Sequence, residues 1–133
     1  MDSIHAYLTV GNFSIWLRSM ELSIRHEVDE VGRPIPGSRH QELTLVFNTT
    51  NHWLMQDWME TPGRRHSGSV TVIEPGGQVL RVTNFERAFC LSVEDAFDRQ
   101  SPTPFVTTLV IAPQNLSFEQ LARVTNWPPI SDN

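Results

Sequence analysis

The fold of this chain is constrained most by two alternating stretches that a long loop separates. Apolar and polar residues alternate over residues 20–24 and again over residues 43–47, and a period of two is typical of half-buried β-strands. The connection between them, residues 28–40, is longer than most hairpin loops and is stiffened by Pro34 and Pro36. Long polar loops held on two strands commonly contact a partner, so we predict a projecting contact loop here.

The composition predicts one globular domain over residues 1–133 with a core of its own. Hydrophobic residues make up 39% of the chain and charged residues 19%, which is ordinary for a folded protein. The formal net charge is -5, and every cation is an arginine because the sequence contains no lysine. The acidic balance argues against a nucleic-acid partner. The missing lysine excludes Schiff-base chemistry and a P-loop.

Targeting and redox features are sparse. No stretch has the length of a membrane span, and the opening residues 1–5 lack the regions of a signal peptide. We therefore expect no membrane insertion, and we expect synthesis in the cytoplasm. The one cysteine, Cys90, predicts no intramolecular disulfide. Its apolar neighbours favour a small buried side chain rather than a reactive thiol.

Hydrophobic periodicity predicts a mainly β fold. A change of phase after Arg18 predicts a bulge or a sharp bend, the polar residues 92–104 predict a loop, and residues 115–127 suggest a short helix. The last apolar run has the character of a central strand buried on both faces. The predicted strands cover residues 4–10, 13–24, 70–73, 79–93 and 105–112.

One clear helix is predicted before the C-terminal region, over about residues 51–60. Thr50 or Asn51 supplies the expected cap, and Pro62-Gly63 ends the helix. We interpret its aromatic stripe as a plug at the core or at an interface. The stripe includes Trp53, Trp58 and Met59. Curled strands, one helix and no βαβ alternation predict a small β-barrel formed by two curled sheets, with the α-helix packed alongside.

Candidate chemistry is absent from these patterns. The histidines include no pair at zinc-ligand spacing, and no serine lies in a Gly-x-Ser-x-Gly motif. Glu27, Asp29 and Glu30 gather in the loop, where no cleft is predicted. Solvation or ion pairs with Arg33 and Arg39 therefore explain them better than catalysis does. We expect no catalytic residues, no metal and no cofactor, and hence no enzyme.

A set of motifs in and after the loop points to a known family. In the loop these are His26, Asp29, Gly32-Arg33-Pro34, Gly37 and Arg39, followed by Leu43-Thr-Leu. Further along, they are Trp58-Met59, Gly68-Ser-Val-Thr-Val, Phe85-Glu86-Arg87-Ala88 and Thr107-Thr-Leu-Val-Ile. In this order the chain resembles the haemolysin-coregulated proteins (Hcp), the tube proteins of bacterial type VI secretion systems, particularly the branch found in Bacteroidetes.

The resemblance implies a structural tube subunit. Family members form hexameric rings that stack into a hollow tube, which a contracting sheath expels without a signal peptide. The implied partners are copies of the chain itself, sheath, baseplate and spike proteins, and effector cargo. We place the inter-ring contact in the loop, and the resemblance places the helix residues Trp53, Trp58 and Met59 at the lumen or at a protomer interface. The predicted contact residues are Asp29, Glu30, Gly32, Arg33, Pro34, Pro36, Gly37 and Arg39.

Three alternatives stay open at this point. The absence of lysine departs from lysine-rich members of the family and leaves room for a paralogue, or for the tube subunit of a related phage-tail-like particle. An alternative of another class is a small-ligand-binding β-barrel, which would be a monomer or dimer rather than a ring. Its interior would be lined by Phe85, Phe89, Leu109 and Trp16.

Overall fold

The computed structural model describes residues 4–119 of the chain. This part contains one helix and eight strands that belong to a single antiparallel sheet. The strands are β1 (His5–Val10), β2 (Phe13–Leu17), β3 (Ser19–Arg25), β4 (His40–Asn48), β5 (Arg65–Ile73), β6 (Val79–Phe97), β7 (Phe105–Ala112) and β8 (Asn115–Glu119), and the helix is α1 (Trp53–Glu60). No helix among residues 4–119 is long and apolar enough to span a bilayer.

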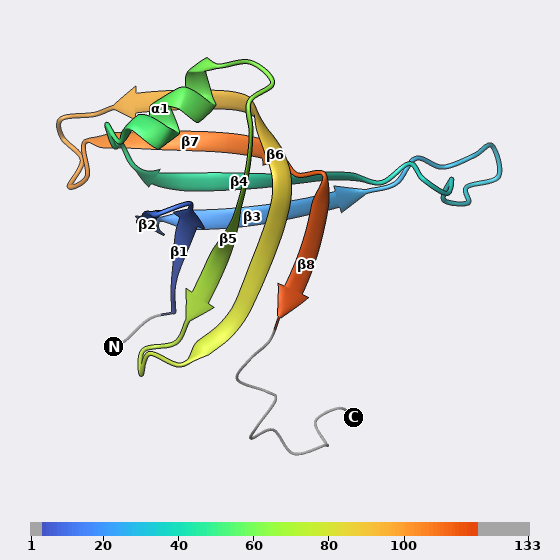
Figure 1. Cartoon of the computed structure of the whole chain (residues 1–133), viewed down its shortest axis with the longest axis horizontal. Helices are drawn as coiled ribbons and strands as arrows, with labels where there is room; N and C mark the ends of the chain where they lie inside the picture. Colours follow the sequence, from blue (N-terminus) through green and yellow to red (C-terminus); the bar gives the residue numbers. More distant parts are fainter. Residues whose placement is uncertain (1–3, 120–133) are drawn as a thin grey trace.

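The sheet follows the order β2-β1-β5-β6-β7-β4-β3, and β8 pairs with β6 beside this path (Figure 1). Strand β6 is 19 residues long and belongs to both halves of the sheet. Its first half pairs with β5 and β8, and its second half pairs with β7. The mainly β class is confirmed, but the two predicted sheets are two halves of one curled sheet.

The predicted closed barrel is wrong for the described residues, because β2 and β3 form the two ends of the hydrogen-bonded sheet. The bend that the sequence predicts after Arg18 lies between these two strands, at Arg18 itself. Strand β2 turns to pair with β1, whereas β3 pairs with β4. Between them, the N–H of Arg18 donates to the carbonyl of Val46 at 2.6 Å. The two successive strands are therefore aligned with different neighbours and do not close a ladder with each other.

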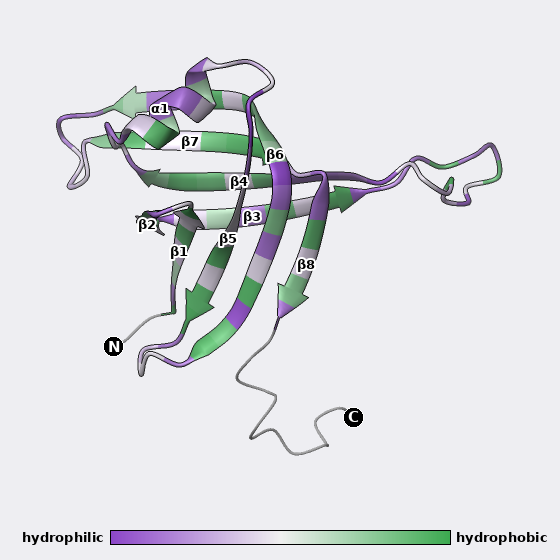
Figure 2. Cartoon of the chain, viewed as in Figure 1, coloured by the Kyte–Doolittle hydropathy of each residue, from purple (hydrophilic) through white to green (hydrophobic). Residues whose placement is uncertain are grey.

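The core lies on one face of the curled sheet, where α1 packs against it. Alternate residues of each strand point inward, and strands β4 and β7 are largely hydrophobic (Figure 2). Strand β7 was predicted to be buried on both faces, but only its alternate residues Thr107, Leu109 and Ile111 are buried. Its other face is half-exposed since nothing described covers it. Other fully buried residues include Leu8, Val10, Leu43, Leu45, Phe47, Val70 and Phe85.

Gly68 marks the closest approach of the strands in the first half of the sheet. A Cβ placed on Gly68 would lie 2.3 Å from the carbonyl oxygen of Thr9 and 2.9 Å from the ring of Phe85. A register shift of β5 against β6 falls between His66 and Gly68. Only glycine therefore fits where β1, β5 and β6 meet.

Strand β6 bends at Arg87, whose φ of 52° is the one positive value of a non-glycine residue in the described chain. Three hydrogen bonds hold this conformation. The N–H of Arg87 donates to Ser67 Oγ at 3.0 Å, and its carbonyl accepts from Arg65 at 2.7 Å. Its Nε donates to Gln114 Oε1 at 2.8 Å. Gln114 lies between β7 and β8, so the bend is held where β6 passes from one neighbour to the other.

Several predicted element bounds need correction. Strand β5 begins at Arg65 rather than residue 70, and β6 continues to Phe97, so the loop covers only residues 98–104. The polar end of β6 is stabilised by pairing with β7, which composition does not reveal. Residues 115–119 form strand β8 rather than the start of a helix. The remaining residues of that predicted helix, 120–127, lie outside the described part.

Candidate assembly surfaces

The loop over residues 28–40 projects far beyond the sheet between β3 and β4 (Figure 1). The two sides of the loop pair with each other and so continue the β3–β4 hairpin. Val28 and Pro34 form an isolated antiparallel bridge. The N–H of Ile35 donates to the carbonyl of Glu27 at 2.7 Å, and the N–H of Asp29 donates to the carbonyl of Arg33 at 2.8 Å. The loop therefore has backbone structure of its own, as expected from its proline content.

Asp29 organises the outer turn of this loop. Its Oδ1 accepts the N–H groups of Val31 at 3.0 Å and Arg33 at 2.9 Å, and its Oδ2 accepts the Arg33 Nε at 3.2 Å. The backbone N–H of Arg33 is the main cause that holds the pKa of Asp29 below its ordinary value, with smaller help from Val31, the Arg33 side chain and Gly32. The predicted ion pair of Asp29 and Arg33 is thus present, and it lies within one loop.

The base of the loop is tied by Ser38. Its hydroxyl donates to the carbonyl of Ile35 at 2.6 Å and accepts the N–H of Glu27 at 2.9 Å. Gly32 and Gly37 have φ values of 88° and 82°, which non-glycine residues rarely adopt. His40 Nε2 and Glu27 Oε2 lie 3.3 Å apart. Hydrogen bonds and turn glycines, not burial, therefore determine the shape of the loop.

The loop carries exposed apolar side chains in addition to the charges that the sequence predicts to be contacts. Val28, Val31 and Ile35 are all exposed, and Val31 is 71% accessible. They appear as hydrophobic segments in an otherwise polar loop (Figure 2). The sequence signal that could have predicted this apolar surface is the presence of three β-branched residues within eight positions of a polar loop. The residues 28–35, here called the loop tip, thus present apolar contact area together with charge.

Helix α1 begins at Trp53 rather than at about residue 51, and His52 is its N-cap. The Nδ1 of His52 accepts the N–H of Leu54 at 3.2 Å. Thr50, one of the two predicted caps, instead accepts the N–H of His52 through its hydroxyl at 3.2 Å. Serine, threonine, aspartate and asparagine are the usual caps. A neutral histidine nitrogen supplies the same acceptor, and the sequence pattern gave no reason to choose it.

The three helix residues predicted to contact a partner lie in different environments. Trp58 is 0% exposed, stacks on Phe85 at 6.1 Å between ring centroids, and donates from Nε1 to the carbonyl of Ala88 at 3.1 Å. Met59 is partly buried against the core. Trp53 is 68% exposed. Trp58 therefore fills the interior of its own protomer, and Trp53 alone offers a large surface to a partner.

Comparison with known proteins identifies the family of the chain that carries these surfaces. The sequence profile of one family, described as "TssD: Hemolysin coregulated protein Hcp (TssD)", matches residues 2–128. The chain belongs to the Hcp family. Hcp proteins are structural, non-enzymatic tube subunits of type VI secretion and other contractile injection systems, and this Hcp protein is such a subunit. No curated protein sequence matches it significantly.

Solved structures share the fold of this Hcp protein at low sequence identity. "Hcp1 from Flavobacterium johnsoniae" superposes with a TM-score of 0.75 and 22% identity, over 87% of this chain and 95% of that chain. A chain of the "PVC sheath-tube complex in extended state" of an extracellular contractile injection system gives 0.61 and 18%, over 87% and 88%. A chain of the "anti-feeding prophage (AFP) baseplate" gives 0.56 and 12%, over 91% and 95%.

The alternative of a ligand-binding interior loses support from the geometry of this Hcp protein. Phe85 and Leu109 are fully buried in the packed core, whereas Trp16 is 59% exposed and lies edge-on to Tyr7 at 5.5 Å. These residues therefore do not line one cavity. Trp16 instead borders a shallow surface hollow of about 250 Å³ with Tyr7, Ser14 and Ile15.

Reactive groups are few on these surfaces. Within residues 4–119 no three histidine, cysteine or acidic side chains gather in a way that would hold a metal ion. Cys90 is half-buried, and burial raises the pKa of its thiol, which disfavours the nucleophilic thiolate. The described surfaces thus offer packing and charge to a partner.

Proposed function

We propose that this Hcp protein forms hexameric rings that stack into a hollow tube, with the loop over residues 28–40 as the contact between rings. The observation that carries this proposal is the loop itself. It is long, projects clear of the sheet, and is already ordered by its own hydrogen bonds. A preorganised segment loses less conformational entropy when it binds. Burying its exposed apolar side chains would favour the docked state.

Unpaired strand edges support the formation of rings. Strands β2 and β3 end the sheet, and residues 91–97 of β6 pair with β7 along one edge only in the described structure. Leu91 and Val93 on this segment are exposed. Open edges are ready to pair with another chain. A ring of identical subunits needs two different surfaces on each protomer, and these edges supply them.

The wider partners follow from the same assignment. Chains of similar fold occur in the sheath-tube complex and the baseplate named above. We therefore infer that the tube of this chain meets sheath, baseplate and spike proteins and carries effector cargo. In this scheme the subunit is made and assembled in the cytoplasm, and sheath contraction then exports the tube.

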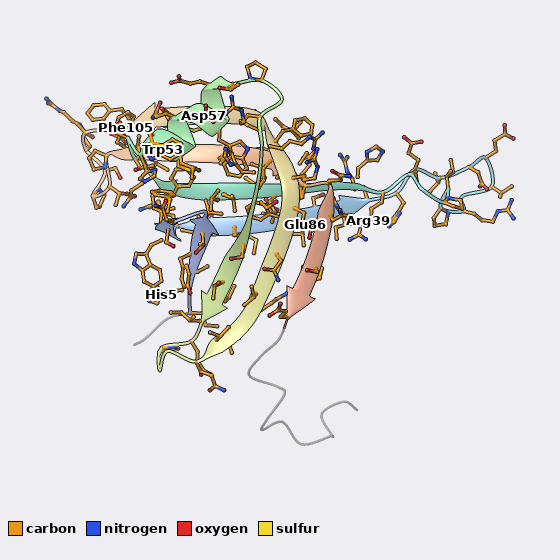
Figure 3. All side chains as sticks on the ribbon, viewed as in Figure 1. His5, Arg39, Trp53, Asp57, Glu86 and Phe105 are labelled. Atoms are coloured by element: carbon orange, nitrogen blue, oxygen red, sulfur yellow. The ribbon has the colours of Figure 1, made fainter. Side chains whose placement is uncertain are left out.

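We assign the predicted contact residues two kinds of role in stacking. Asp29, Gly32, Arg33 and Gly37 shape the loop, because their bonds and φ angles lie within it. Glu30 and Arg39 are free to meet another ring, since neither has an ion-pair or hydrogen-bond partner among the described residues. Arg39 lies at the base of the loop (Figure 3). Pro34 and Pro36 restrict the backbone between Glu30 and Arg39.

The test removes the outer turn and keeps the rest of the loop. Residues 29–33 are replaced by Asn-Gly, a two-residue turn that suits the flanking bridge of Val28 and Pro34. Native mass spectrometry and negative-stain electron microscopy then compare variant and wild type. We expect wild-type rings and tubes, and variant rings without tubes. A matched control makes the same Asn-Gly replacement at residues 75–77, in the turn between β5 and β6, and should still form tubes.

Two results would contradict the proposal. If the variant lacking residues 29–33 makes tubes of normal length, the loop is not the stacking element. If the wild type stays monomeric at high concentration, ring formation itself is wrong, and the small-ligand-binding alternative regains its place.

A further inference from the structure

Exposed apolar side chains gather at the end of the molecule opposite the loop. Trp53 and Phe97 are each 68% exposed, and Phe105 is 47% exposed. Trp53 and Phe105 both lie at this end, and the loop lies at the other end of the longest axis (Figures 1 and 3). We call Trp53, Phe97, Phe105 and the neighbouring Arg99 the aromatic end. Phe97, Arg99 and Phe105 were not predicted as contact residues from the sequence.

The aromatic end is formed by three elements that the fold holds together. Phe97 and Phe105 are the last register pair of β6 and β7, and their rings meet edge-on at 6.0 Å. The N–H of Thr49 donates to the carbonyl of Phe105 at 3.1 Å, which fixes the end of β4 beside them. Trp53 opens α1 a few residues later and lies next to the ring of His52 at 5.9 Å. Large aromatic side chains on a rigid base are typical of interface centres.

Each end carries a charged side chain that has no ion-pair partner among the described residues. In the loop tip, Asp29 is paired with Arg33, which leaves Glu30 as an exposed acid with no partner among the described residues. At the aromatic end, Arg99 is exposed in the turn after β6 and likewise has no described partner. Its neighbour Asp98 uses Oδ1 to accept the N–H of Gln100 at 3.0 Å. Glu30 at one end and Arg99 at the other are therefore unpaired charges of opposite sign, and Asp98 beside Arg99 keeps its own negative charge because a neutral N–H does not cancel it.

We propose that the aromatic end is the receiving surface for the loop tip of the next copy in the stack. This inference rests on the proposed tube function and adds to it the site at which the loop binds. Stacking of identical rings joins two different surfaces displaced along one axis, and these two surfaces occupy opposite ends of the subunit. The apolar residues Val28, Val31 and Ile35 would cover the aromatic rings, while Glu30 and Arg99 would fix the orientation.

The experiment is a charge swap across the contact. Tube formation is followed by light scattering against protein concentration at low salt, with electron microscopy to confirm tubes. We expect Glu30→Arg alone and Arg99→Glu alone each to raise the concentration needed for tubes by about tenfold, and the double variant to return within about twofold of wild type. The matched control combines Glu30→Arg with Arg81→Glu. It has the same net charge as the swap and should not restore tubes.

A cross-link gives a second, independent measurement. In a Cys90→Ser background, Val31→Cys is combined with Gln100→Cys, at an exposed position beside Arg99 that keeps the aromatic rings, and oxidised after tubes have formed. We expect a ladder of covalent oligomers under denaturing conditions, and monomer when either added cysteine is omitted.

The outcomes distinguish a failure of this docking site from a failure of the proposed tube function. If wild type forms tubes but the matched control recovers as well as the swap, or if no ladder forms, the receiving surface lies elsewhere and the tube function stands. If wild type forms no rings or tubes, both the function and the docking site are wrong.

Discussion

The loop over residues 28–40 and helix α1 both carry residues that the sequence marks as contacts, yet they are held in opposite ways. The loop makes its own hydrogen bonds and exposes its apolar side chains. The helix instead places Leu54, Met55 and Trp58 in the core. A segment held locally can change its partner without affecting the fold, whereas a segment held by the core cannot. The comparison teaches that mutations in the loop should affect assembly and mutations in the buried face of α1 should affect stability.

The largest expected effect lies on the helix side of this comparison. Trp58→Ala removes a fully buried ring and its hydrogen bond to Ala88, so we expect the free energy of unfolding to fall by about 3–5 kcal/mol. Trp58→Phe is the matched control, and it keeps most of the packing. Chemical denaturation followed by circular dichroism measures both. An unchanged midpoint for Trp58→Ala would show that the helix does not depend on the core.

Gly68→Ala should lower the free energy of unfolding somewhat less than Trp58→Ala does. It tests the packed part of the molecule in the same way. The new methyl group would lie 2.3 Å from the Thr9 carbonyl oxygen, so β1 and β5 must separate, at a cost of about 2–3 kcal/mol. Gly76→Ala is the control, because nothing lies within 4 Å of a Cβ there. Equal melting temperatures for the two variants would contradict the close approach of the strands.

On the loop side, Gly32→Ala should affect assembly without affecting the core. A φ of 88° is strained for alanine, and the local cost is about 1 kcal/mol. The strain falls on a turn that contacts only the loop itself. We therefore expect the free energy of unfolding to fall by no more than this strain, about 1 kcal/mol, and fewer tubes by electron microscopy. A strongly lowered midpoint together with normal tubes would show that Gly32 supports the fold rather than assembly.

The smallest effect is a pH dependence of the loop tip. Hydrogen bonds led by the Arg33 N–H lower the pKa of Asp29, so the ordered tip is favoured above the pKa of a free aspartate, about 3.9, and loses this support as pH falls through the lower folded value. Tube formation should therefore weaken in acid before the fold is lost. Asp29→Asn should stack poorly at every pH. If its tubes match wild type at pH 7, the Asp29 carboxylate does not order the tip.

Strand alternation predicted most of the fold from sequence because it depends on local period. The bend at Arg18 was visible for the same reason, as a change of phase between β2 and β3. Closure of the barrel was not predictable, since it depends on which distant strands pair. The strand character of residues 115–119 depends in the same way on pairing with β6.

The candidate site was predicted in part. Residues 28–40 stood out by length and proline content, and the pairing of Asp29 with Arg33 was correctly expected. The sequence gave no means to tell the buried Trp58 from the exposed Trp53, because both lie on one apolar stripe. It also hid Phe97 and Phe105, whose exposure follows from their place at the open end of a strand pair.

Hydrogen exchange measured by mass spectrometry on rings and on tubes tests the central claim most directly. The claim is that the loop is an assembly element, independent of the core, that docks between rings. We predict that amides of residues 28–35 exchange more slowly in tubes than in rings, while amides of α1 are equally protected in both. Equal exchange of residues 28–35 in the two states, or slowing confined to α1, would contradict the account.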